Sequence, residues 1–104
     1  MGVDYGWEKF YKALRYAMGS NEPVQERLAS VISGVHHLNR DSFPDDETYE
    51  KFQTMVKAST MVPAKANEGT IRSSVSHMKD GEATLWLETA FDIFTKIAES
   101  EAHL

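Results

Sequence analysis

Two aromatic-rich stretches decide the fold: YGWEKFYKALRY at residues 5–16 and LWLETAFDIFTKI at residues 85–97. In both, large apolar residues recur three and four positions apart, which is the repeat of one face of an α-helix. Together they hold most of the large rings of the chain. We therefore expect two amphipathic helices that pair as the aromatic half of a core, with Met18 and Phe91 among the core residues.

Three further helical patterns lie between these stretches. We expect helices over residues 6–18, 22–38, 44–62, 68–78 and 81–100, the third ended by Pro63. Hydrophobic alternation with period two, the signature of strands, is missing. Short connections favour antiparallel neighbours. The prediction is an all-α, four-helix-bundle-like single domain over residues 1–104, with a short extra helix before the last long one. A more globular packing with steep crossing angles is the alternative.

Short polar residues mark the expected helix starts. Asp4 is placed to cap the first helix, because a short carboxylate accepts from free amides of the first turn. Ser42 is placed to cap the third helix, with Pro44 at its first position and Phe43 as a hydrophobic staple. The second and third helices are expected to form the aliphatic half of the core. Gly34, inside the second helix, fits either a close helix–helix contact or chance.

The composition excludes several classes of function. The chain has 104 residues, a formal net charge of −5 and no cysteine. Disulfides, thiolate zinc sites and thiol nucleophiles are therefore excluded. The basic residues are scattered, so binding along a nucleic-acid backbone is not expected. No apolar run reaches the roughly 20 residues that span a bilayer, and the N-terminus lacks the pattern of a secretory signal. We expect a cytoplasmic protein.

The titratable residues show no metal-binding spacing. His36 and His37 are adjacent, so on a helix they point about 100° apart and cannot form a helical metal clamp. A Glu-x-x-His pair, typical of di-iron bundles, is missing. Asp45, Asp46 and Glu47 fit a solvated first helical turn, where the helix dipole favours acids. No metal and no cofactor are predicted.

One short motif suggests an alternative function. The run Arg72-Ser73-Ser74-Val75-Ser76-His77 resembles the motif of HEPN-type ribonucleases, which are small helical proteins that dimerise to form one site. The resemblance implies a metal-independent ribonuclease with His77 as general base and Arg72 as the cation on the scissile phosphate. The competing interpretation is that Arg72 pairs with Glu68 and His77 lies exposed at a helix end.

A second likeness covers nearly the whole chain. The order of YGWEK at residues 5–9, QERL at 25–28, FPDD at 43–46 and EGTI at 68–71 is similar to short bacterial helical proteins of unknown function. It implies a complete bacterial protein and carries no activity, cofactor or catalytic residue.

The preferred hypothesis is a non-enzymatic helical interaction or regulatory protein. Tyr5, Tyr16 and Tyr49 lie at the edges of their apolar stripes. Tyrosine offers a large contact area at low entropic cost, so these three are predicted to bind a protein partner or a second copy in a homodimer. The alternative is that they simply rim the core.

Overall fold

The computed structural model describes residues 2–62 and 69–100 as a bundle of helices. The elements in chain order are α1 (Val3–Gly19), α2 (Val24–Val35), the 3-10 helix η1 (Arg40–Ser42), α3 (Asp46–Ala58), α4 (Thr70–Ser76) and α5 (Asp80–Ser100). Within these ranges there is no β-strand. The predicted all-α, bundle-like fold with a short helix before the last long one is therefore confirmed.

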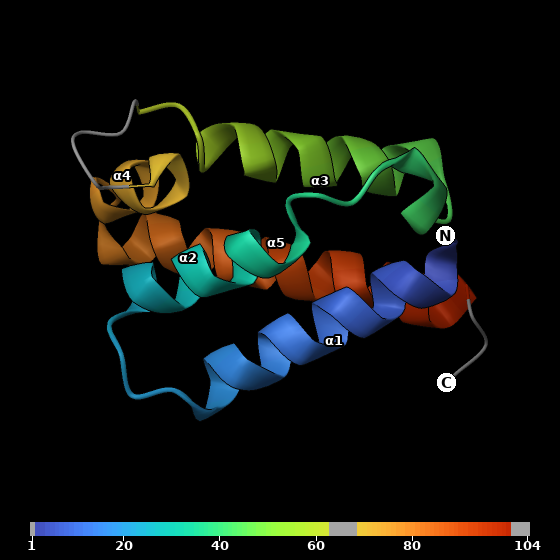
Figure 1. Ribbon diagram of the computed structural model, residues 1–104, viewed down its shortest axis with the longest axis horizontal. Helices are drawn as coiled ribbons and strands as arrows, with labels where there is room; N and C mark the ends of the chain where they lie inside the picture. The colour runs from blue at the N-terminus through green and yellow to red at the C-terminus, as the bar shows by residue number, and fades with distance from the viewer. Residues whose placement is uncertain (1, 63–68, 101–104) are drawn as a thin grey trace.

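Helix α5 is the centre of the bundle. It packs on α1, α2 and α3, while α4 packs on α2 and η1 packs on α1. Figure 1 shows α1 and α3 on opposite sides of α5, with α4 at one end of the bundle. The side chains of Ala90, Ile93 and Ile97 are fully buried. They lie three and four residues apart, so they share the face of α5 that meets the other helices.

The placement of Phe91 in the core was wrong. Its side chain is 54% exposed, whereas Ile93, which the expected stripe omitted, is fully buried. Phe91 follows Ala90, and one residue turns an α-helix by about 100°. Because Ala90 faces the core, the ring of Phe91 lies on the flank of α5.

An aromatic cluster joins α1 to α3. The Phe10 ring lies 6.3 Å from the Phe43 ring and 6.2 Å from the Phe52 ring, both edge-on. Phe43 and Phe52 are 4.6 Å apart. These spacings are typical of favourable aromatic pairs. Phe43 also packs on Tyr49 of α3 at 5.3 Å, although it stands two residues before the cap Asp45 rather than directly before it, where a hydrophobic staple lies. The expected aliphatic half was wrong for α3, since it brings rings to the core.

A close contact between η1 and α1 explains one glycine. Gly6 is buried, and a β-carbon there would lie 2.5 Å from the carbonyl oxygen of Ser42. Any larger residue would push η1 away from α1. At Gly34 a β-carbon would lie 3.4 Å from Cβ of Ala13. This is an ordinary van der Waals distance, so the packing of α1 on α2 leaves room for a methyl group at Gly34 and does not require a glycine there.

The helix caps differ from those expected. Asp45 caps α3, since its Oδ1 accepts from the backbone N–H of Thr48 at 2.7 Å. This hydrogen bond lowers the pKa of Asp45 below its ordinary value. Ser42 does not cap α3, because it is buried in η1. Asp4 does not cap α1 either; it lies within the first turn, after Gly2 at the cap position.

Candidate functional site

The three tyrosines predicted to bind a partner differ in exposure. Tyr16 is 56% exposed, and its hydroxyl donates to Oε1 of Glu22 at 3.3 Å. Tyr5 is half-buried, with its hydroxyl 3.1 Å from Nε2 of His37. Tyr49 is half-buried against the aromatic cluster. Along α1, the rise of 1.5 Å per residue separates Tyr5 from Tyr16 by about 16 Å. Of the three, Tyr16 presents the most ring to a partner.

The structure places Arg72 and His77 at opposite ends of α4. Arg72 forms an ion pair with Glu26 of α2, while Glu68 lies outside the described residues. His77 follows α4, and its Nδ1–H donates to the carbonyl oxygen of Ser73 at 2.7 Å. Five residues turn an α-helix by about 140°, so Arg72 and His77 leave α4 in different directions. Their joint action on one phosphate stays a prediction.

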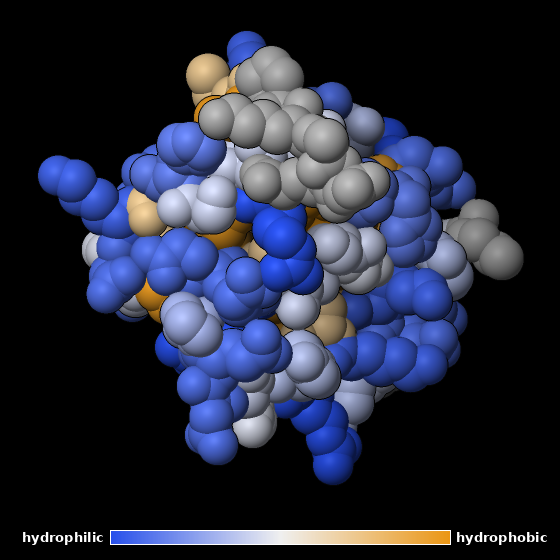
Figure 2. Space-filling model, turned by 60° about the vertical axis from the view of Figure 1, so that its left-hand side comes forward, coloured by the Kyte–Doolittle hydropathy of each residue, from blue (hydrophilic) through white to orange (hydrophobic). Residues whose placement is uncertain are grey.

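A polar hollow brings Arg72 close to His36 rather than to His77. The hollow has a volume of about 350 Å³ and is lined by Ser33, His36, Thr60, Gly69, Thr70, Ile71 and Arg72. Figure 2 views the end of the bundle where α4 lies and shows mainly hydrophilic residues, with hydrophobic ones in recesses. Because Glu26 already neutralises Arg72, the hollow attracts anions only weakly.

His36 and His37 stand side by side at the end of α2. The rings of His36 and His37 are exposed and meet edge-on at 6.2 Å. Across residues 2–62 and 69–100, no three histidine or acidic side chains gather in a way that could hold a metal ion.

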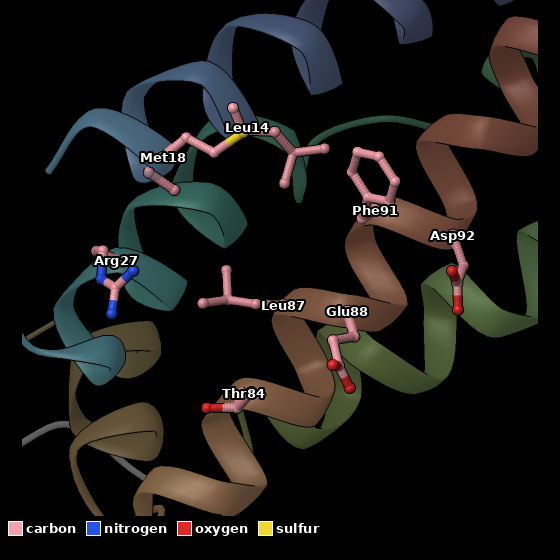
Figure 3. Close-up of a pocket in the computed structure, with 9 residues that line it drawn as sticks. Leu14, Met18, Arg27, Thr84, Leu87, Glu88, Phe91 and Asp92 are labelled. Carbon is pink, nitrogen blue, oxygen red and sulfur yellow. The ribbon is translucent and has the colours of Figure 1, made fainter.

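An apolar groove lies between α1 and α5. It has a volume of about 520 Å³ and is lined by Leu14, Ala17, Met18, Arg27, Thr84, Leu87, Glu88, Phe91 and Asp92. Figure 3 shows Met18 and Leu14 on one side of the groove, facing Phe91 and Leu87 across it. Pockets of this size hold small ligands or anchoring side chains of a protein partner.

Met18 was expected in the core, and this was wrong. Its side chain is 80% exposed, while the neighbouring Ala17 is buried. Ala17 takes the core position near the end of α1, so Met18 points about 100° away from it. The sequence signal that could have revealed the groove is a surplus: α1 and α5 carry more large apolar residues than their buried faces accommodate.

A second hollow extends this groove along α1. It is lined by Tyr11, Leu14, Arg15, Met18, Phe91 and Phe94, so it shares Leu14, Met18 and Phe91 with the first. Tyr11 is held in place by stacking on Trp7 at 5.1 Å and by a hydrogen bond from Nη1 of Arg15 at 2.9 Å. We call the surface formed by the lining residues of both hollows the α1–α5 groove.

The charges at the rim of the α1–α5 groove are separated by sign. Arg15 of α1 and Arg27 of α2 lie on one side, and Glu88 and Asp92 of α5 lie on the other. Figure 3 shows Arg27 across the groove from Glu88 and Asp92. The groove therefore has an apolar centre, one basic edge and one acidic edge.

Comparisons with protein-family models, curated proteins and solved structures find no match for this chain. The likenesses to short bacterial helical proteins and to HEPN-type ribonucleases stay predictions. In the part of the chain that the structure describes, no helix is both long enough and apolar enough to cross a membrane.

Proposed function

We propose that the protein is a non-enzymatic helical interaction protein that binds another protein surface through the α1–α5 groove. The observation that supports this proposal most strongly is the exposure of Met18 and Phe91 above an apolar groove with a charged rim. Protein interfaces combine an apolar, water-excluding centre with a polar rim in this way. Methionine adds adaptability, because its unbranched side chain repacks against different partners.

The groove also replaces two of the tyrosines as the preferred contact. Tyr5 and Tyr49 use their rings or hydroxyl groups within the molecule, so binding a partner through them would break existing contacts. Tyr16 stays exposed, and it lies one helical turn from Lys12 and close to Met18 in sequence. Tyr16 lines a hollow between α1 and α2 rather than the α1–α5 groove, so its contact with a partner stays a separate prediction.

A matched pair of variants on α5 tests the proposal. Phe91→Glu places a charge inside the groove, whereas Leu85→Glu changes an equally exposed residue on the same helix that does not line it. Both side chains are more than half exposed, so neither change removes core packing. We expect capture of a protein from the native host to be lost in Phe91→Glu and kept in Leu85→Glu, with circular dichroism unchanged in both. Equal capture by both variants contradicts the proposal.

The ribonuclease hypothesis is the second candidate function. An RNA cleavage assay distinguishes it from the interaction proposal. A general base and a cation must reach the same phosphate, but Arg72 is paired with Glu26 and Nδ1 of His77 is bonded to Ser73. We expect purified protein to leave RNA intact between about pH 5 and 9 without added metal. Cleavage that His77→Ala abolishes would establish the enzyme and displace the interaction proposal.

A further inference from the structure

The distribution of charge around the α1–α5 groove points to its occupant. We infer that the groove binds the same groove of a second copy of this chain, forming a two-fold homodimer in which α1 of one copy faces α5 of the other. This inference rests on the proposed function, since it uses the same surface, and it adds the identity of the partner.

The first argument is the opposite charge of the two helices. Helix α5 carries acidic residues at Asp80, Glu82, Glu88, Asp92 and Glu99 against the single base Lys96. The bases that line the groove are Arg15 of α1 and Arg27 of α2, whereas Lys9 and Lys12 line a separate hollow between α1 and α2. A partner that matches both edges must present a basic edge next to an acidic one at the same spacing. A second copy of the groove meets that requirement, because it carries the same basic and acidic edges at the same spacing.

The second argument is symmetry, which selects one orientation. In a two-fold dimer the same patch meets itself, so the axis lies in the interface. An axis across the groove would place α1 on α1 and bring Arg15 towards Arg15 of the second copy. An axis along the groove places each basic edge on an acidic edge. Because like charges facing each other in an interface are strongly unfavourable, the axis runs along the groove.

The lining residues fix the register of this pairing. Arg15 shares its hollow with Phe91 and Phe94, on either side of Asp92 in the sequence, and Arg27 shares the other hollow with Thr84 and Glu88. A two-fold rotation about an axis along the groove leaves the position of each residue along that axis unchanged. Arg15 therefore meets Asp92 of the second copy, and Arg27 meets Glu88 of the second copy. The apolar centre, Leu14, Met18 and Phe91, lies beside the axis and is covered from both sides.

The area of the face sets the expected affinity. Helix α1 has 17 residues and so is about 25 Å long, and two neighbouring helices make a face about 20 Å wide. The flat outline of this face is about 500 Å² per copy, which is smaller than the 800 Å² or so that each partner buries in a standard interface. We therefore expect a dissociation constant in the micromolar range, with stronger association at low salt because the edges are charged.

Sedimentation equilibrium of the full chain between about 1 and 500 μM, in low and high salt, tests the inference. Phe91→Glu is expected to weaken dimerisation at least about thirtyfold, and Leu85→Glu to leave it unchanged. Arg15→Glu and Asp92→Lys are each expected to weaken it about threefold or more, and the double variant to restore it, because the reversed charges again meet opposite charges.

The outcomes separate this inference from the proposed function. A wild-type monomer throughout the concentration range overturns the homodimer, and a dimer that Phe91→Glu leaves intact overturns dimerisation through the α1–α5 groove. Two weakened single variants without recovery in the double variant overturn the α1-on-α5 orientation. If the wild type is a monomer while Phe91→Glu alone loses capture of a host protein, the groove serves a different partner and only the homodimer falls.

Discussion

Replacing Gly6 by alanine tests the contact between η1 and α1 most directly. A β-carbon at Gly6 would lie 2.5 Å from the carbonyl oxygen of Ser42, so the new methyl group meets backbone rather than a side chain that can rotate away. Ser42 is followed by Phe43, which is buried in the aromatic cluster. The backbone of η1 therefore cannot move without loosening that cluster.

The magnitude follows from two opposing terms. Alanine inside a helix gains about 0.5–1 kcal/mol over glycine, whereas forcing an extra methyl group into a close-packed site costs about 1–3 kcal/mol. The net expectation for Gly6→Ala is a loss of about 1–2 kcal/mol in the free energy of unfolding. For a domain of this size that lowers the melting temperature by roughly 5–15 °C.

Gly34→Ala is the matched control. It lies in the interior of α2, and its β-carbon would meet Cβ of Ala13 at 3.4 Å, an ordinary contact. We expect a gain of about 0.5 kcal/mol, or no change, from helix propensity. Urea denaturation followed by circular dichroism at 222 nm measures both variants. A Gly6→Ala protein as stable as the wild type would refute the close packing of η1 on α1.

Three further perturbations probe the core, a cap and an ion pair. Met55→Ala removes a fully buried side chain and should cost about 2–5 kcal/mol, whereas Met61→Ala, at an exposed position, should stay within about 0.5 kcal/mol in the same urea assay. The pKa of Asp45 is lower in the folded protein than in the unfolded chain, so its ionised carboxylate stabilises the fold at any pH above the unfolded pKa of aspartate. This contribution is lost as the pH falls through the folded pKa. The variant Asp45→Asn should therefore be less stable than the wild type at pH 7, and its melting temperature should fall less steeply below about pH 4. A double-mutant cycle on Arg72 and Glu26, an exposed pair, should give a coupling of less than about 1 kcal/mol that falls with added salt.

The helices could be predicted from periodicity, but their ends could not. Both Ser42 and Asp45 are good capping residues, and each stands shortly before the apolar pattern of α3. The choice between them depends on Gly6, which lies far away in sequence and whose missing side chain leaves room for the Ser42 backbone of η1 to pack on α1. A local pattern cannot report a contact between such distant residues.

The candidate site was harder to predict for a related reason. Phe91 and Ile93 are both large and apolar and stand two residues apart in α5, and the expected stripe included Phe91 and left out Ile93. Which of them is buried depends on where α1, α2 and α3 pack around α5, and periodicity does not contain that information. The α1–α5 groove exists because Ala17 and Ala90 occupy the buried positions beside Met18 and Phe91, so the larger neighbours stay outside.

The burial of Phe43 gives the connection before α3 a different resistance to proteases from the connection between α1 and α2. Cleavage requires a segment of chain to open locally and extend into the protease. Residues 21–23, between α1 and α2, are exposed, so they can be cut in the native protein. The connection before α3 holds Leu38, Ser42 and Phe43 in the interior, so cutting it requires the aromatic cluster to open. Limited digestion should therefore cut the chain at residues 21–23 before it cuts the connection ahead of α3. The α1 fragment should then stay bound to the rest of the protein until denaturant separates the two.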